Sequence, residues 1–598
     1  MSQNSKKKLH IPTSKAGKIL TNLLVTLAVG GAYFYVSLPA LNLQSNDFYS
    51  FMILLCVVYV VSALITSGFK GQKEAVSAKE QVREYFRFIK QQCLPVGVLL
   101  LLLMAVALVG QVISMPIFRA GAYRDLLAVE DGEFAQDIGQ ISFSEIPTLD
   151  KDSANFLGDR QMGTLSDMVS QFEYSYDSTQ INYQGRPVRV APIAYADLVK
   201  WFTNRGSGLP AYVIVDMVTQ EATVTRLTEG MKYSFSEPLN RNIMRHLRFQ
   251  YPTYIFDTPQ FEIDEEGQPW WIAPRIIKTI GLFGGTDIKG AVLCNAITGE
   301  SQYYEEVPAW VDNVYTPELI MEQYDYYGMY SNGFLNSILG QKDVKVTTDG
   351  YNYIAIGDDV YMYTGVTSVT SDQSNIGFIL SNQRTKETRF YSCAGATEAS
   401  AQASAQSQVQ QMRYTATFPL LLNIADQPTY FMALKGEDGL VKMYAMVNVQ
   451  QYSIVSTGGT VAACEASYRQ ALADNGLIGD SETEVIPSDQ AEVSGAIAEI
   501  RSAVMDGNSY YFFRLEGGDV FYAVSAAENP LAVILNVGDR VTITYTTGTA
   551  ASILSGTQIH REDQPEEEIS LPIQEEEQED PALSGDTASS EETPLPAA

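Results

Sequence analysis

The sequence predicts a membrane anchor of three α-helices, an α+β body and a small C-terminal β-barrel. Three observations carry this prediction. The first 118 residues contain three apolar runs of membrane-spanning length. Helical patterns then alternate with antiparallel hairpins as far as residue 486, which is typical of α+β folds. Short strands separated by turn residues fill the stretch 497–559, as in a small barrel of the OB or SH3 type.

The three apolar runs are 19–41, 48–69 and 94–118. Each is about 20 residues long or slightly more, which is enough to cross a hydrocarbon core about 30 Å thick. Charged residues are missing from their central parts, so we expect three transmembrane helices. A cleavable signal peptide is an alternative for the first run, but it lacks a clear small-residue cleavage site and two more spans follow.

The charged flanks of these runs predict the orientation of the chain. Lysines precede the first run, six Lys or Arg residues separate the second from the third, and the segment 42–47 has neither. The positive-inside rule then places the N-terminus in the cytoplasm and everything after residue 118 outside. The loop 72–92 has an amphipathic pattern that predicts a helix on the inner membrane surface, with a cytoplasmic docking site as the alternative. We therefore expect a multi-pass plasma-membrane protein in contact with the lipid bilayer.

Charge and cysteine content narrow the class of the body. Up to residue 118 there are 11 Lys and Arg against 4 Asp and Glu, and beyond it 29 against 66. Such an acidic body repels phosphate backbones, so nucleic acid is not an expected partner. The five cysteines are scattered without a CxxC motif, which indicates a protein that does not depend on disulfides. A single Cys294–Cys464 bridge stays an alternative.

One turn pattern, [D/N]-x-x-T-x-E, occurs three times, at Asp216–Glu221, Asn295–Glu300 and Asn382–Glu387. We expect each copy to join two antiparallel strands, with the Thr and Glu securing the bend. The copies suggest repeated helix and hairpin units. The expected domains are the transmembrane anchor (1–118), a stalk with the first unit (119–236), a second unit (237–350), a third hairpin unit (351–486), a barrel (495–560) after a hinge at 487–495, and a disordered acidic tail (561–598).

The one basic concentration in the body is Arg241, Arg245 and Arg248. Their i, i+4 and i+7 spacing would place them on one face of a helix. They are the candidate anion- or partner-binding residues, because guanidinium groups bind carboxylates and phosphates. The alternative is a solvated helix face paired with some of the surrounding acids.

Residues for catalysis are scarce. His246 is the only histidine well inside the body, and no H-E-x-x-H, G-x-S-x-G or P-loop motif follows residue 118. We therefore expect no catalytic, cofactor-binding or metal-binding residues. The 66 acids still offer carboxylate pairs, so an envelope hydrolase that acts on wall polymer stays an alternative.

The hairpins also carry a family resemblance. The strands VIVDMVTQEATV (213–224) and AVLCNAITGESQYY (291–304) resemble the PepSY domain, whose strand reads as apolar residues, Asp and then T-G-E. Gln220 and Lys386 replace the turn glycine in two copies. The span 144–472 is similar to uncharacterised multi-span membrane proteins of Gram-positive bacteria with PepSY-like repeats.

PepSY domains are thought to inhibit or regulate peptidases, so the resemblance implies a non-catalytic regulatory or binding role outside the cell. We expect a membrane-anchored binding or scaffold protein of the bacterial envelope that holds another envelope protein or a peptide. A structural homo-oligomeric membrane assembly is a further alternative.

Overall fold

The computed structural model describes residues 14–68, 78–139, 146–369, 371–479, 490–505, 508–518, 520–526, 529–546 and 553–561. The chain divides into two compact units, Met1–Ile486 and Pro487–Ala598. The predicted acidic tail falls outside the described residues, apart from Arg561 at the end of a strand.

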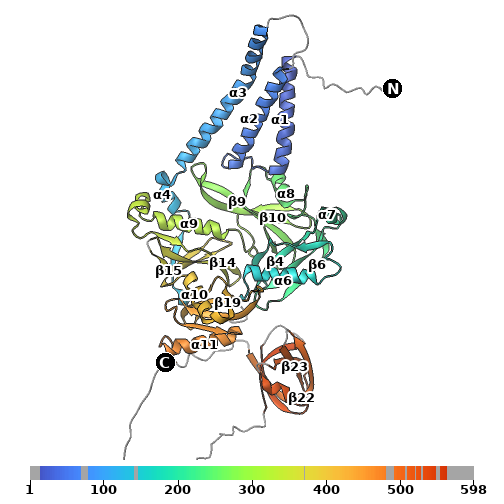
Figure 1. Cartoon of the computed structure of the whole chain (residues 1–598), viewed down its shortest axis with the longest axis vertical. Coiled ribbons are helices and arrows are strands. Elements are labelled where there is room, and N and C mark those ends of the chain that lie inside the picture. Colours follow the sequence, from blue (N-terminus) through green and yellow to red (C-terminus); the bar gives the residue numbers. More distant parts are fainter. Residues whose placement is uncertain are drawn as a thin grey trace, which may run out of the picture. The chain divides into compact units, whose positions relative to one another are not determined.

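Three helices of the first unit are long and apolar enough to cross a membrane, as predicted. They are α1 (Lys15–Ser37), α2 (Asn46–Gly68) and α3 (Ala78–Ile113), and Figure 1 shows them on one side of the β-rich body of this unit. The prediction of a separate helix at 72–92 is wrong for its described part, because residues from Ala78 onward belong to α3. The Lys, Glu, Gln and Arg residues before Pro95 are good helix formers, so the helix continues into the apolar run.

Helices α1 and α2 pack closely through small and polar residues. The side chain of Asn22 is fully buried, and its Oδ1 accepts hydrogen bonds from Ser62 Oγ and Thr66 Oγ1, both at 2.9 Å. Gly30 lies where a Cβ atom would collide with the side chain of Leu55. Polar pairs and small residues are the usual means of helix association in membranes, where burial of apolar surface provides no driving force.

After α3 the chain passes through α4 (Pro116–Arg124), β1 (Val129–Gly132) and α5 (Phe134–Asp137), and then forms four β-sheets. The first sheet follows α6 (Lys151–Gly163) and contains β2 (Phe172–Tyr174), β3 (Thr179–Tyr183), β4 (Arg186–Tyr195), β5 (Leu209–Asp216) and β6 (Ala222–Met231), with α7 (Leu198–Asn204) before β5. The second follows α8 (Ile243–Gln250) and contains β7 (Ile255–Phe256), β8 (Gln260–Ile263), β9 (Pro269–Ile280), β10 (Gly284–Asn295) and β11 (Ser301–Tyr304).

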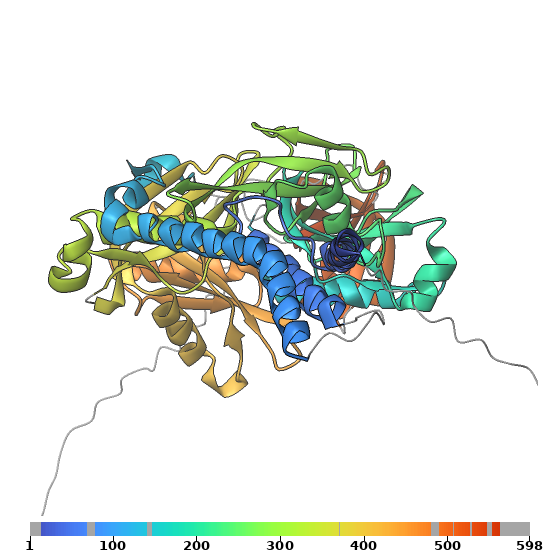
Figure 2. The ribbon, with the colours of Figure 1, turned by 90° about the horizontal axis from the view of Figure 1, so that it is seen from above.

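The third sheet follows α9 (Pro317–Tyr330) and a π-helical turn (Asn336–Gly340), and it contains β12 (Lys345–Thr347), β13 (Asn352–Ile356), β14 (Asp359–Ser368), β15 (Ser371–Asn382) and β16 (Thr388–Ala396). Strand β1 joins its edge parallel to β16. The fourth follows α10 (Glu398–Gln408) and contains β17 (Thr415–Ala416), β18 (Leu420–Ile424), β19 (Gln427–Lys435), β20 (Val441–Asn448) and β21 (Val455–Gly458), and α11 (Val461–Asp474) comes after it. Figure 2 shows the same elements from above.

The four sheets share one pairing scheme. In each, the first two strands pair with the third, the third with the fourth, and the fourth with the fifth. The predicted third hairpin unit, 351–486, is therefore divided between two sheets. The turn of the fourth sheet, from Asn448 to Ile454, does not show the [D/N]-x-x-T-x-E pattern, because it is one residue longer and lacks the Thr and Glu.

The turn between the fourth and fifth strands is built alike in all four sheets. The Oδ1 atom of an Asp or Asn accepts the backbone N–H groups two and three residues further on, at distances of 2.8–3.1 Å, and these acceptors are Asp216, Asn295, Asn382 and Asn448. Such side-chain bonds to the following backbone stabilise turns. Three of the turns also contain a residue with positive φ, namely Gln220, Gly299 and Lys386.

The residue after each of these acceptors connects the turn to the rest of its sheet. We call the four of them the junction residues: Met217, Ala296, Gln383 and Val449. All are at most 1 % exposed. Each donates its backbone N–H to a carbonyl at the start of the long third strand, and its own carbonyl accepts an N–H from the segment before the helix of that sheet. These bonds link the turn both to the third strand and to the segment before the helix, and they pair backbone groups that have no partner in a neighbouring strand.

The second unit contains a closed barrel in the order β22–β23–β24–β26–β25. Its strands are β22 (Gln490–Met505), β23 (Asn508–Leu515), β24 (Phe521–Ser525), β25 (Arg540–Thr546) and β26 (Ile553–Arg561). Residues 490–495, predicted as part of a hinge, instead begin β22, because pairs such as Val493 with Ile543 extend the ladder to β25. The OB or SH3 type of this barrel stays a prediction.

Candidate functional site

A pocket of about 410 Å³ is lined by residues of three sheets of the first unit and by Phe418, which lies between two strands of the fourth. We call it the four-sheet pocket. Strands β3 and β4 contribute Gln180 and Arg189, and β8 contributes Gln260. The third sheet contributes Tyr353 and the junction residue Gln383, and Phe418 precedes β18 of the fourth. No single sheet forms this pocket, so it exists only in the assembled body.

Arg189 is a buried cation without a counter-ion. Its side chain is 4 % exposed, and among the described residues no carboxylate forms an ion pair with it. Nη1 donates to the carbonyl oxygen of Ser178 at 3.1 Å, Nη2 donates to Gln180 Oε1 at 3.4 Å, and Nε has no partner there. Burial lowers the pKa of Arg189. A buried charge is costly without a partner, so this residue is not explained by the stability of the fold.

Two buried amides line the same pocket with unused hydrogen-bonding atoms. Gln180 is 4 % exposed and its Nε2 has no partner in the described structure. Gln383 is 1 % exposed, and neither its Nε2 nor its Oε1 has a partner there. Buried polar groups are nearly always paired with protein or bound water. Together with Arg189 Nε, these lining residues hold three donors and one acceptor that have no partner in the described structure, and all four atoms are shielded from solvent.

Aromatic side chains form part of the wall, and charged groups lie at the pocket edge. Burial raises the pKa of both Tyr315 and Tyr351 to about 12, so these phenols are neutral hydrogen-bonding groups. Lys151, Asp152 and Glu318 are exposed lining residues. Asp150, also in the lining, forms an ion pair with Lys435.

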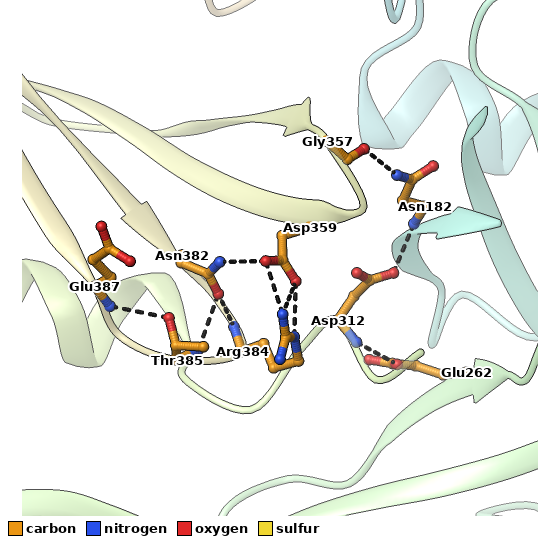
Figure 3. A network of polar contacts seen from close by, with 9 residues as sticks. All are labelled: Asn182, Glu262, Asp312, Gly357, Asp359, Asn382, Arg384, Thr385 and Glu387. Atoms are coloured by element: carbon orange, nitrogen blue, oxygen red, sulfur yellow. Dashed lines mark hydrogen bonds and ion pairs between the residues drawn. The ribbon is translucent and has the colours of Figure 1, made fainter. Parts of the chain in front are cut away.

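A chain of polar contacts beside this pocket connects three of the sheets (Figure 3). Glu262 on β8 accepts the backbone N–H of Asp312, whose own carboxylate accepts the N–H of Asn182 on β3 at 2.7 Å. Asn182 Nδ2 then donates to the carbonyl oxygen of Gly357 beside β14. In the same view, Arg384 forms a two-pronged ion pair with Asp359.

Glu262 and Asp312 are fully or almost fully buried carboxyl groups. Burial raises the pKa of Glu262 to about 7, and burial together with the nearby Glu262 raises that of Asp312 well above its ordinary value. Neither residue lines the four-sheet pocket. Their hydrogen bonds to backbone groups of other segments join the sheets.

The predicted anion-binding residues donate hydrogen bonds to backbone carbonyl groups. Arg241 precedes α8, outside the helix, and donates to the carbonyl of Arg205. Arg245 donates to the carbonyl groups of Tyr35, Pro238 and Leu239. Arg248 donates to those of Leu38, Tyr251, Pro252 and Tyr254. Two of the three arginines thus bind the end of α1, and the expected anion site stays a prediction.

The remaining reactive side chains are held in structural contacts. His246 Nε2 lies 2.7 Å from the carbonyl oxygen of Gly299, and its ring packs on Tyr233. The five cysteines are free, and burial raises the pKa of Cys294 and Cys464 to about 12. No group of three or more potential metal ligands occurs among the residues that the structure describes.

Sequence reasoning did not single out Arg189, Gln180 or Gln383. One signal was present for Arg189, a charged residue inside the otherwise apolar stretch PVRVAPIAY. The two glutamines have no such mark, because only the packing of the sheets buries them. No protein-family model matches this chain, and no curated protein matches its sequence.

Proposed function

We propose that this chain is a membrane-anchored, non-catalytic binding protein of the bacterial cell envelope, with a ligand held in the four-sheet pocket. The observation that supports this proposal best is the buried guanidinium of Arg189, which has no counter-ion among the described residues. Buried polar groups kept at a cost to stability are most common at functional sites.

The proposal includes PepSY-like units as the scaffold of the body. The shared pairing scheme of the four sheets and their equivalent turns support four related units in place of the three expected. In this arrangement the units supply the walls of the pocket, and the repeated turns maintain the fold. A regulatory role towards an envelope partner remains part of the proposal.

Binding is favoured over catalysis by the residues around the pocket. Neither a histidine nor a cysteine belongs to its lining, so a nucleophile activated by an imidazole is missing there. The buried carboxyl pair Glu262 and Asp312 does not line the pocket. The carboxyl groups that do line it belong to Asp150, which is paired with Lys435, and to the exposed Asp152 and Glu318. A wall-polymer hydrolase would need two such groups on opposite sides of a glycosidic bond, and it is the alternative to the proposed binding function.

The proposed orientation keeps the N-terminus in the cytoplasm and the body outside. A membrane-impermeant maleimide tests it on intact cells, in a background without the partly exposed Cys93. Ser170→Cys, at an exposed position of the body, should react, whereas Lys90→Cys on α3 should react only after permeabilisation. The reverse labelling pattern would refute the orientation.

Ligand binding is tested on the full-length protein purified from native membranes. Native mass spectrometry should detect a small molecule retained by the wild type, and a panel of small molecules and short peptides should include one that raises the unfolding temperature. Arg226→Met, in an exposed ion pair with Asp167, is the control and should retain the ligand. Absence of both a retained compound and a stabilising compound would reject a binding pocket.

A further inference from the structure

We infer that the ligand of the four-sheet pocket carries a single carboxylate group, which Arg189, Gln180 and Gln383 hold. This inference rests on the proposed binding function and names the chemistry of its ligand. It follows from what the same positions contain in the other three sheets, and from the charge that the pocket can accept.

Arg189 on β4 is paired with Gln180 on β3. Arg189 lies two residues after Pro187, whose carbonyl accepts the N–H of the junction residue Met217. The matching cross-strand pairs of the other sheets are Phe261 with Trp271, Tyr353 with Met362 and Leu421 with Tyr430. In these three pairs the residues on the long third strand are Trp271, Met362 and Tyr430, and each is at most 1 % exposed. Aromatic and aliphatic side chains therefore fill this position in three sheets, and packing does not require a guanidinium in the first.

Gln383 is a second exception of the same kind. The other junction residues are Met217, Ala296 and Val449, all buried and apolar. The backbone bonds of the junction are equivalent in all four sheets, so they do not depend on the side chain. The amide of Gln383 has no partner within the described structure and lines the four-sheet pocket. Two independent positions thus depart from the shared pattern, and both departures add polar groups to one pocket.

The charge of the pocket selects a monoanion. Arg189 is the only buried cation in its lining. The exposed lining charges are Lys151, Asp152 and Glu318, and Asp150 is paired with Lys435. A phosphate monoester would bring a charge of about −1.5 to −2 at neutral pH, more than one guanidinium neutralises. A carboxylate matches the single positive charge. Its two oxygens can accept hydrogen bonds from the unused donors Arg189 Nε, Gln180 Nε2 and Gln383 Nε2.

The remainder of the ligand faces aromatic side chains, including Tyr315, Tyr353 and Phe418. These surfaces suit an apolar or aromatic group attached to the carboxylate. A free carboxylic acid and the C-terminal carboxylate of a short peptide both offer this chemistry. The experiment therefore contains an arm for each source.

Calorimetric titration of the full-length, detergent-solubilised protein with matched probes tests the inference. The free-acid arm compares N-acetyl-phenylalanine with N-acetyl-phenylalaninamide, and the peptide arm compares Ala-Ala-Phe with its C-terminal amide. Inorganic phosphate is the third arm. We expect a carboxylate of at least one source to bind, and its amide to bind about 30-fold more weakly or not at all, because the amide lacks the charge-assisted bond.

The shared pattern supplies substitutions that should fold. Arg189→Met introduces the residue found at the equivalent position 362, and Gln383→Met the residue found at 217. Arg189→Met should abolish carboxylate binding and raise the unfolding temperature of the unliganded protein, because it removes a buried unpaired charge. Gln383→Met should weaken binding to a smaller extent. Arg226→Met should change neither property.

The outcomes separate the inference from the proposed function. Equal binding of acid and amide would overturn the carboxylate inference and leave a binding pocket in place. Binding of phosphate alone, lost in Arg189→Met, would overturn it in favour of another anion. Lack of binding in all arms overturns it as well, and the proposed function then depends on the retained or panel ligand described above. Carboxylate binding that survives Arg189→Met would also contradict the assigned site.

Discussion

The Nε atom of Arg245 donates to the backbone carbonyl oxygen of Tyr35 over 3.0 Å, and its guanidinium carbon lies 4.3 Å from the centre of the Tyr35 ring. Tyr35 belongs to the last turn of α1, where backbone carbonyl groups lack helical partners. A cation at this end of a helix also complements the helix dipole. Arg248 makes the equivalent hydrogen bond to the carbonyl oxygen of Leu38, so two arginines of α8 bind the end of the first candidate membrane span.

Removing the hydrogen bonds of Arg248 should destabilise the first unit. Arg248 is 5 % exposed and donates to four carbonyl oxygens. Arg248→Met keeps the apolar stem but leaves these acceptors unpaired, so we expect a loss of about 2–4 kcal/mol in unfolding free energy. Denaturant unfolding in detergent measures it. Arg124→Met, at an exposed ion pair with Asp125, is the control, and an equal effect of both variants would contradict the specific role of Arg248.

The turn at Asn295 should be sensitive to a single methyl group. Gly299 and Gly185 have nearly the same φ, 77° and 75°, but a Cβ at 299 would collide with the ring of Tyr233, whereas at 185 it meets nothing. Gly185→Ala should cost about 1–2 kcal/mol from backbone strain. Gly299→Ala should cost about 1–3 kcal/mol more because of the collision. Thermal unfolding of the two variants side by side measures the difference, and similar losses would show that the predicted collision is absent.

Stability should depend on pH through the buried carboxyl pair. The pKa of Glu262 is raised from 4.5 to about 7, and that of Asp312 is raised too, so both carboxyl groups are stabilised in the protonated form. Their contribution is complete below the unfolded pKa values and is lost as the pH rises through the folded ones. The unfolding temperature should therefore fall as the pH increases through about 7.

Asp312→Asn tests the origin of this pH dependence. The amide oxygen can still accept the N–H of Asn182, while the negative charge beside Glu262 is removed. We expect a flatter pH profile than in the wild type and a higher unfolding temperature above neutrality. Asp167→Asn, at an exposed ion pair, should leave the profile unchanged. A wild-type profile that does not fall between mildly acidic and mildly alkaline pH would refute the explanation.

The contact between α1 and α2 should depend on one amide. Asn22 Oδ1 accepts from Ser62 and Thr66, so Asn22→Leu removes the common acceptor of two buried hydroxyl groups. Polar contacts between membrane helices contribute about 0.6–2 kcal/mol each, and we expect a loss in that range. Unfolding in mixed detergent measures it. Thr21→Val is the control, because Thr21 bonds only within its own helix, to Gly17.

Local patterns were sufficient for several elements. Apolar length alone identified the three candidate spans, with ends within a few residues except where α3 begins earlier and ends at Ile113. The three [D/N]-x-x-T-x-E patterns marked turns, because Asp and Asn side chains bond to the backbone within the same turn.

Interactions between distant segments were beyond such patterns. The spacing of Arg245 and Arg248 predicts a shared helical face, but it does not identify the residues that they bind, Tyr35 and Leu38, which lie about 210 residues away in the chain. The turn of the fourth sheet does not show the repeated pattern, because it is one residue longer and has neither the Thr nor the Glu. Its relation to the other three turns therefore appears only in the strand pairing.

Sequence alone therefore establishes where this chain can cross a membrane, that its body is rich in β-structure, and where three of its hairpins turn, because each of these depends on residues close together in the chain. The pocket depends on tertiary packing, which brings Gln180 and Arg189 of the first sheet and Gln383 of the third to one place. The free-energy cost of burying Arg189 arises only in that assembly, because water solvates the guanidinium group in the unfolded chain. Its significance appears only once the surrounding sheets exclude water.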